Sequence, residues 1–262
     1  MSLFCGQIHH LIRCAAASRR IQCPSVSRRD KTADWKSERA ASHRRIAGVR
    51  DIAARLCATA ESWVGRPYRA NPLSGGPAEP ERLVCDLSGF DCVTFVESAL
   101  AVARSVSGAG FLAELRRLRY RGGRVDWRAR LHYFSDWMKC NHRRGAIRIR
   151  TRGPGARMVQ ARLSAIPELL PRTARFFVVP KRSLRRALPR FEDGSVVAFG
   201  STRAGLDFFH VGLVFFRRGR PMLFHASKSR GRVLAEPLER FLAKNRTRGL
   251  AFATPLAPEA RR

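Results

Sequence analysis

The pattern of hydrophobic and polar positions divides the chain into a tail and one domain. Residues 18–45 are polar and basic without periodicity, so we expect a disordered tail over residues 1–45. Apolar residues then recur at helical spacing over 46–64, and short apolar runs bounded by turn residues begin near residue 175. Helices first and strands later predict a single α+β domain over residues 46–262, with helices packed on one antiparallel sheet.

The predicted elements place one cysteine at the start of a helix. A helix that begins at Asp91 or Cys92 and runs to about residue 106 has Asp91 as its N-cap, because a carboxylate accepts hydrogen bonds from the free amides of the first turn. Shorter helices are expected over 111–119 and near 130–140. The expected strands cover 175–179, 195–199, 208–216, 221–226 and 250–253.

Charge is the unusual feature of the composition. Hydrophobic residues make up 45% of the 262 residues, an ordinary value, whereas 51 basic against 20 acidic residues give a net charge of +31. Residues 143–190 carry fourteen Arg or Lys and a single acid, Glu168. Nucleic acid, an acidic wall polymer or a membrane surface would be a partner of matching charge. We favour the alternative, arginine spread over a solvated surface, because net charge bears on solubility and non-specific binding rather than on a reaction.

The cysteines and the N-terminus narrow the class of protein. No two of the seven cysteines are two to four residues apart, which argues against a zinc knuckle or a redox dithiol, and the odd count gives no disulfide framework. The sequence contains no run of 18 apolar residues, so no membrane-spanning helix is predicted. Polar residues interrupt the short apolar stretch over 3–17, so no signal peptide is predicted and the compartment stays open.

Cys92 has the position that a nucleophilic thiol requires. At the first residue of a helix, its thiol would lie at the positive end of the helix dipole, which lowers the pKa of a thiol and favours the thiolate. The backbone amides of the same turn could hold the oxyanion of a tetrahedral intermediate. The alternative is a buried structural cysteine, the usual role of this residue type.

Two histidines favour the nucleophilic role of Cys92 over the structural one. His210 and His225 lie in consecutive predicted strands joined by a short turn at 217–220. A loop of two or four residues pairs residues whose numbers sum to 437, which places His225 opposite Gly212 and both imidazoles on one face. A three-residue loop would break this parity. Two half-buried structural histidines are the alternative, and the catalytic interpretation requires that their shared face meets the helix beginning at Cys92.

Four segments carry a resemblance to a known family: GRPYRANPL (65–73), FDCVTFVESAL (90–100), GLDFFHVGLV (205–214) and LFHAS (223–227). Together they resemble the NlpC-type papain-like cysteine peptidases, and more closely the bacterial N-acetylmuramoyl-L-alanine amidase-like family. The segment RARLHYFSDWMKCN (128–141) also resembles that family, so the resemblance covers roughly residues 46–255. One departure is Gly194-Ser195, where relatives usually have Gly-Asp.

The resemblance implies a papain-like fold and roles for individual residues. Cys92 would be the nucleophile, His210 its base, and His225 the third polar residue, which orients His210. The family also implies a periplasmic or cell-envelope location. The candidate substrate-binding residues are Tyr68, Asp91, His132, Asn141, Asp207 and Ser227.

The weaker candidates have structural alternatives. Tyr68 resembles the family's upstream Tyr, which would donate to the oxyanion or bind substrate, and a wedge in the core is equally compatible with the sequence. His132 and Asn141 could line the cleft, but their spacing also suits an ordinary helix face. Asp207 could orient the catalytic imidazole or cap a turn, and we favour the turn. Glu97 is expected on the outer face of its helix.

These features predict a cysteine-nucleophile amidase or peptidase with a Cys-His-His triad. Its substrate would be an amide bond in a peptidoglycan fragment or muropeptide, and no metal or organic cofactor is needed. The same site would serve a D-glutamyl-diaminopimelate-type endopeptidase or an acyltransferase. A basic protein that binds nucleic acid or another polyanion without activity would instead show strongly salt-dependent binding. A metal site built from Cys92, His210 and His225 would make activity sensitive to chelators, and the oligomeric state stays open.

Overall fold

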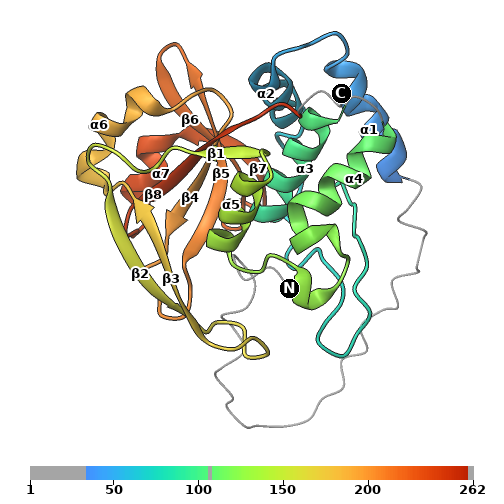
Figure 1. Ribbon diagram of the computed structural model, residues 1–262. Coiled ribbons are helices and arrows are strands. Elements are labelled where there is room, and N and C mark those ends of the chain that lie inside the picture. Colours follow the sequence, from blue (N-terminus) through green and yellow to red (C-terminus); the bar gives the residue numbers. More distant parts are fainter. Residues whose placement is uncertain (1–33, 106–107, 259–262) are drawn as a thin grey trace, which may run out of the picture.

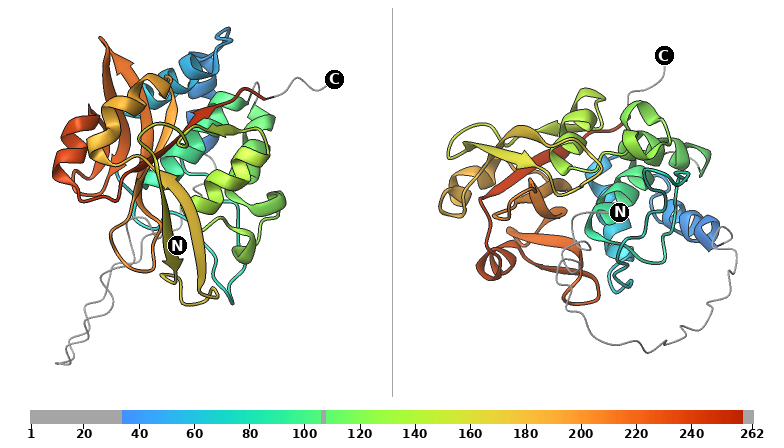
Figure 2. Two further views of the ribbon diagram at one scale, coloured as in Figure 1. Left: turned by 60° about the vertical axis from the view of Figure 1, so that its left-hand side comes forward. Right: turned by 90° about the horizontal axis from the view of Figure 1, so that it is seen from below.

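The fold consists of a helical layer, a six-stranded sheet and a second, smaller helical layer (Figures 1 and 2). The computed structural model describes residues 34–105 and 108–258. The helices are α1 (Asp34–Arg45), α2 (Ile52–Ser62), α3 (Cys92–Arg104), α4 (Gly108–Arg119), α5 (Phe134–Arg143), α6 (Leu184–Ala187) and α7 (Leu238–Lys244). No helix within the described ranges combines the length and the apolar composition needed to span a membrane.

The sheet is antiparallel throughout. Its strand order is β1-β8-β4-β5-β6-β7, while β2 and β3 form a separate hairpin (Figure 1). The strands are β1 (Ile147–Ile149), β2 (Arg157–Leu163), β3 (Arg172–Val178), β4 (Ser195–Gly200), β5 (Phe208–Arg217), β6 (Arg220–Ser227), β7 (Arg232–Pro237) and β8 (Leu250–Pro255). The expected α+β class is therefore found, and all five predicted strands are present, although β3 belongs to the separate hairpin.

The central strands are buried on both faces. Leu213 and Phe215 of β5 join an apolar cluster with α2, α3 and α4, whereas Val214 between them joins a second cluster with α6 and α7. Strands covered on both sides read as nearly continuous apolar runs, which explains the pattern FFHVGLVFF in β5. The layer of α3 and the layer of α7 therefore contact opposite faces of this strand.

The N-terminal boundary of the domain was predicted too late. Residues 34–45 form α1, although their sequence has no amphipathic period. Tertiary contacts hold this helix: Trp35 with Phe111, whose ring centroids are 6.4 Å apart, and Glu38 with Arg66 in an ion pair. The prediction of a disordered tail is therefore wrong for 34–45, and its remainder, 1–33, lies outside the described residues.

The helix expected over 46–64 is shorter than predicted. It begins at Ile52 because Asp51 caps it, with Asp51 Oδ2 accepting from Ala54 N at 2.7 Å. Gly48 has a φ of 76°, which turns the chain between α1 and α2. Ile46, the first residue of the predicted helical pattern, is buried but lies in this turn rather than in a helix.

The turn between β5 and β6 contains two residues, Arg218 and Gly219, with φ values of 51° and 75°. Positive φ at both central positions characterises the two-residue turns whose twist matches that of the flanking strands. The ladder pairs Leu213 with Phe224, so the numbers of paired residues sum to 437. The predicted register is confirmed.

Several elements were not predicted: β1, β2, β7, α6 and α7. In β2 the buried residues Val159, Ala161 and Leu163 alternate with exposed ones, but arginines at both ends of the strand obscure the apolar signal. The same mixture of charged and apolar residues obscures the apolar signal of β7.

Candidate active site

Cys92 is the first residue of α3, and a capping box fixes that start. Asp91 Oδ1 accepts from Thr94 N at 2.7 Å, and Thr94 Oγ1 accepts from Asp91 N at 3.0 Å. This reciprocal pair satisfies amides that a helix start would otherwise leave unpaired. The N-cap prediction for Asp91 is confirmed, and its carboxylate is engaged by the helix.

The backbone places Cys92 at the positive pole of α3. Phe95 N donates to Asp91 O at 3.0 Å, the first backbone hydrogen bond of this 13-residue helix, so the amides of the first turn precede it. Two other thiols have a different environment. Burial raises the pKa of Cys85 to about 12 and also raises the pKa of Cys57, which keeps both groups protonated at neutral pH.

The β5–β6 ladder brings two imidazoles into direct contact. His210 Nε2 lies 2.7 Å from His225 Nδ1, and the rings are nearly perpendicular, with centroids 4.8 Å apart. Gly212 leaves the space for this contact, since a Cβ there would lie only 3.1 Å from His225 Cβ and 2.7 Å from Leu223 Cδ1. The predicted sharing of one face is therefore confirmed.

A carboxylate from β7 extends the pair and fixes its polarity. His225 Nε2 lies 3.2 Å from Glu236 Oε1, and because an ionised carboxylate only accepts, Nε2 carries the hydrogen. Burial, and secondarily the charge of His210, lowers the pKa of His225 to about 2, so His225 is neutral and its Nδ1 accepts. His210 Nε2 therefore donates, which leaves His210 Nδ1 as the position for an exchangeable proton.

Phe241 of α7 forms a wall against both imidazoles. Its ring centroid lies 5.2 Å from that of His210 and 5.3 Å from that of His225. Val211 and Ala226, which follow the two histidines in sequence, instead join the apolar cluster of α3. The rings therefore leave the sheet on its α7 side, and the expectation that their shared face meets α3 was wrong, because side chains alternate along each strand.

The start of α3 nevertheless lies at the end of the sheet that holds the histidines. His210 is the third residue of β5 and His225 the third from the end of β6, so in this antiparallel pair they share one end. The strand β7 starts at the same end, and Tyr68 N donates there to Gly231 O at 2.8 Å. Tyr68 in turn pairs with Phe90, two residues before α3 begins.

Glu236 was missed by the sequence analysis. In the ladder His225 pairs with Leu234, and Glu236 lies two positions further along β7, on the same face. The signal that could have found it is the alternation of RVLAEP after the turn residues SRG, which predicts a third strand antiparallel to β6.

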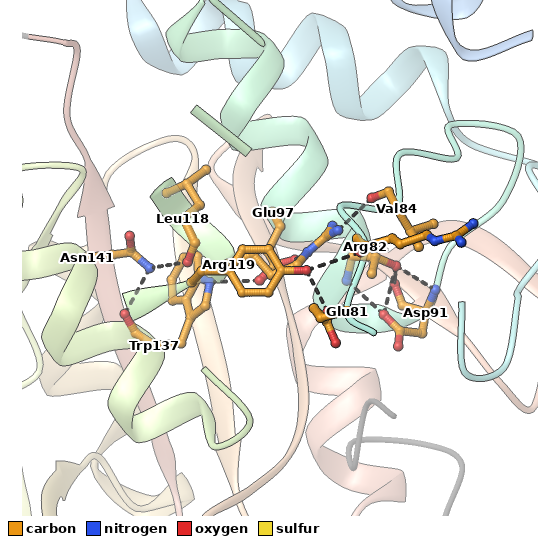
Figure 3. A network of polar contacts seen from close by, with 11 residues as sticks. Glu81, Arg82, Val84, Asp91, Glu97, Leu118, Arg119, Trp137 and Asn141 are labelled. Carbon is orange, nitrogen blue, oxygen red and sulfur yellow. Dashed lines mark hydrogen bonds and ion pairs between the residues drawn. The ribbon is translucent and has the colours of Figure 1, made fainter. Parts of the chain in front are cut away.

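A second buried polar network lies beside α3 and is ionic (Figure 3). Glu97 Oε2 lies 2.7 Å from Arg119 Nε, and Glu97 Oε1 accepts from Trp137 Nε1 at 3.1 Å. The prediction of an exposed Glu97 was wrong, because every residue of α3 is buried and the helix has no outer face. Burial raises the pKa of Glu97, and the charge of Arg119 opposes this shift.

The ionic network holds the loop that leads into α3. Arg119 Nη1 donates to Val84 O at 2.6 Å, and Tyr120 OH donates to Glu81 Oε1 at 2.6 Å. Arg130 Nη2 lies 2.9 Å from Glu81 Oε2, with both side chains buried. Two buried ion pairs, Arg119–Glu97 and Arg130–Glu81, thus fix the loop from which the capping residue and the thiol follow, and Figure 3 shows the first of them.

Comparison with known proteins gives the family. Residues 58–250 match the family model called AmiA-like, described as N-acetylmuramoyl-L-alanine amidase-like. The chain belongs to the AmiA-like family. The matched residues include Cys92, His210, His225 and Glu236. No curated protein matches the chain.

Solved structures share the AmiA-like fold over nearly their whole length. An N-acetylmuramoyl-L-alanine amidase from Bacteroides uniformis ATCC 8492 has a TM-score of 0.70 at 25% identity, covering 78% of this chain and 98% of that one. A putative xylanase from Bacteroides fragilis has a TM-score of 0.65 at 28% identity, covering 74% and 98%. A Legionella pneumophila str. Philadelphia 1 protein has a TM-score of 0.75 at 19% identity, covering 86% and 95%, and shows the fold alone.

Two of the remaining candidates have structural roles in this AmiA-like chain. His132 Nε2 lies 2.7 Å from Trp127 O, and burial lowers the pKa of His132 to about 4, so the ring is neutral. Asn141 Nδ2 donates to Leu118 O and to Trp137 O, each at 3.0 Å. Asn141 therefore lies within α5, as the helix-face alternative expected, whereas His132 precedes that helix and is held by a backbone carbonyl.

Asp207 and Ser227 shape the chain on either side of the histidines. Asp207 Oδ2 accepts from Ser135 N at 2.7 Å, which caps the first turn of α5 from the start of β5, and burial raises the pKa of Asp207. Ser227 Oγ accepts from Arg230 N at 3.3 Å in the turn before β7. Asp207 therefore caps the start of a helix, and not the turn that the sequence analysis favoured.

The alternative metal site at Cys92, His210 and His225 is not supported. The two histidines direct facing nitrogens at each other, and the outer nitrogen of His225 is taken by Glu236. Within the parts of the chain that the structure describes, no group of three or more His, Cys, Asp or Glu side chains is placed to hold a metal ion.

Proposed function

We propose that this AmiA-like chain is a cysteine-nucleophile hydrolase that cleaves an amide bond in peptidoglycan-type peptides, with Cys92, His210 and His225 as its triad. The family description and the name of the Bacteroides uniformis structure support the substrate class. The papain-like arrangement is part of this proposal: a thiol at a helix start in one layer, and imidazoles on the sheet beside it.

The contact between the two imidazoles is the observation that carries the proposal. A buried His210 Nε2–His225 Nδ1 hydrogen bond of 2.7 Å leaves Nδ1 as the reactive nitrogen of His210. That nitrogen and the start of α3 lie at the same end of the sheet. Because the rings leave the sheet on its α7 side, the thiol would approach His210 around the ends of the strands rather than across the sheet face.

The first half of the reaction forms a thioester. His210 Nδ1 takes the proton of the Cys92 thiol, and the thiolate attacks the carbonyl carbon of the amide. Backbone amides of the first turn of α3 stabilise the resulting oxyanion. The C–N bond then breaks as His210 gives its proton to the leaving amine.

The second half releases the acid. Water gives a proton to His210 Nδ1 and attacks the thioester carbonyl, and the C–S bond then breaks as His210 returns that proton to the departing sulfur, which regenerates the Cys92 thiol and the neutral imidazole. His225 stays neutral throughout and accepts from His210 Nε2, which holds the imidazole in one orientation. Phe241 shields this hydrogen bond from water on the α7 side.

The test compares purified muropeptides incubated with the wild type, Cys92→Ala and Cys85→Ala. We expect the wild type and Cys85→Ala to yield the same products by mass spectrometry and Cys92→Ala to yield none. Cys85 is a matched control because its thiol is protonated at neutral pH. Wild-type turnover by Cys92→Ala would overturn the proposal.

The same experiment identifies the bond and the reaction type. Release of the intact stem peptide indicates cleavage at the muramoyl amide, whereas release of a shortened peptide indicates cleavage at the D-glutamyl bond. An added amine that appears in the product would indicate acyl transfer, since both reactions pass through the thioester on Cys92.

A further inference from the structure

We propose that Glu236 is a positioning residue of this site: its carboxylate holds His225 in the tautomer that orients His210 toward the thiol of Cys92. This inference rests on the proposed function, since it assigns a role within the same set of residues. Glu236 is not one of the residues that the sequence resemblance brings to the site.

The strand β7 places this carboxylate by ladder geometry. His225 pairs with Leu234, so the side chain two positions along, Glu236, lies diagonally on the same face and within reach of the ring. The observed separation is 3.2 Å between His225 Nε2 and Glu236 Oε1. The side chain of Glu236 is 18% exposed and that of His225 is 2% exposed, so the contact is largely shielded from water.

The carboxylate selects one of two tautomers. With Glu236 as acceptor, His225 carries its hydrogen on Nε2, and its Nδ1 lone pair receives the N–H of His210. Without Glu236, the Nδ1–H tautomer would direct an N–H at the N–H of His210. That clash would turn the His210 ring out of its orientation toward Cys92. The resulting loss of activity would appear in kcat, which reports the chemical step, rather than in KM.

The negative charge of Glu236 has a second effect, on the imidazolium that forms during the reaction. The groups that face Glu236 are His225 from β6 and Arg240 from α7, whose Nε lies 4.0 Å from Glu236 Oε2 and whose side chain is 58% exposed. Beyond His225 lies His210 from β5, while Phe241 of α7 is apolar. A negative charge two rings away favours the imidazolium that forms when the thiol of Cys92 gives up its proton.

The experiment uses Glu236→Gln, Glu236→Leu and the matched control Glu239→Gln in the full chain. Glu239 is an exposed acid three residues later, in the first turn of α7, and its replacement removes the same charge from the neighbouring surface. Muropeptide hydrolysis is measured as kcat and KM across a pH series. Urea unfolding of each variant shows whether the fold is retained.

We expect Glu236→Leu to lower kcat by about 10- to 100-fold with KM within about twofold of wild type. Glu236→Gln still accepts from His225 but lacks the charge. It should retain more activity, with the alkaline limb of its pH profile shifted downward by roughly 0.5 pH unit. Glu239→Gln should match the wild type. Unchanged kcat in Glu236→Leu, or an equal loss in Glu239→Gln, would overturn the inference.

A ring measurement separates this inference from the proposed function. Nitrogen chemical shifts of labelled histidine report which nitrogen of His225 is protonated, without any turnover. Wild type should show a single Nε2–H tautomer, and Glu236→Leu a mixture. An unaltered tautomer in Glu236→Leu would contradict the positioning role even if Cys92→Ala is inactive. An active Cys92→Ala would contradict the proposed function, and the tautomer result would be unaffected.

Discussion

The two buried polar networks of this molecule differ in kind. At the end of the sheet, His210, His225 and Glu236 form a chain of hydrogen bonds in which the central ring is neutral. Beside α3, Glu97 and Arg119 form an ion pair with both charges buried. The first arrangement can hold or release a proton at its free end, whereas the second is compensated in charge and ties segments of the chain together.

This difference determines how activity and stability should respond when one member of each network is replaced. Loss of His210 leaves only the neutral imidazole of His225 without its partner, so the free energy of unfolding changes little while proton transfer stops. Loss of one member of the ion pair leaves an uncompensated buried charge, which costs stability while the chemical groups stay in place. Activity and stability should therefore respond separately to substitutions in the two networks.

The largest effect is expected for His210→Ala. Because the imidazole moves a proton in both halves of the reaction, kcat/KM should fall by about 10³-fold or more, as in Cys92→Ala, and the double variant should be no worse. The free energy of unfolding should change by only about 1–2 kcal/mol. Muropeptide turnover and urea unfolding provide the measurements, and activity within tenfold of wild type would exclude His210 as the base.

Arg119→Met tests the ionic network. It leaves Glu97 buried without its partner, so we expect the free energy of unfolding to fall by about 3–5 kcal/mol, with the activity of the remaining folded protein within a few-fold of wild type. Arg117→Met is the matched control, since Arg117 is 52% exposed and pairs with Glu114 at 3.3 Å. That surface substitution should cost under about 1 kcal/mol. Equal losses in the two variants would show that the buried pair does not anchor the fold.

Acid should weaken the fold through the buried neutral histidines. Burial lowers the pKa of His225 to about 2 and that of His132 to about 4, from 6.5 in the unfolded chain. As the pH falls below 6.5, the unfolded chain binds protons that the folded chain does not, so stability falls by about 1.4 kcal/mol per pH unit for each ring. This loss should stop near pH 4 for His132 and continue to lower pH for His225.

The measurement is urea unfolding at pH 7 and pH 5 for wild type and His225→Asn. The variant lacks one of the two rings, so its loss of stability over this range should be smaller by about 2 kcal/mol. Comparison of the two proteins cancels the contribution of the carboxylates that both contain. Identical pH dependence in both would mean that His225 is not held neutral by the fold.

The smallest effect separates orientation from proton transfer. His225→Asn keeps a side-chain oxygen that can accept from His210 Nε2, so we expect a loss of about tenfold in kcat, whereas His225→Ala should lose more. Initial rates on one muropeptide at fixed pH are sufficient. If the Asn and Ala variants are equally impaired, the hydrogen bond to His210 is not what His225 contributes.

Local signals in the sequence were sufficient to predict part of the site. Asp91 before Cys92 predicted the helix start, because N-capping depends on residues three positions apart. The turn at Arg218-Gly219 fixed the register of β5 and β6, because side-chain parity follows from loop length alone. Both predictions rest on interactions within a few residues along the chain.

The rest depends on contacts between distant segments. Nothing near Glu97 in the sequence indicates that Arg119 will lie against it, and a helix buried on every side cannot be recognised from its own period. The face on which His210 and His225 emerge depends on which helical layer covers which side of the sheet. Glu236 stayed hidden because its strand carries charged residues among few apolar ones.

The two-residue turn limits how relatives of this chain can change in length. If the turn stays two residues long, insertion of a single residue between Arg217 and Arg220 would shift every residue of β6 by one position relative to β5, and His225 would then point into the layer of α3. Insertions of two residues leave the orientation intact. An active relative with an odd length change at this hairpin should therefore have a turn of different length, so that the added residue enlarges the loop and leaves the histidine pair on one face.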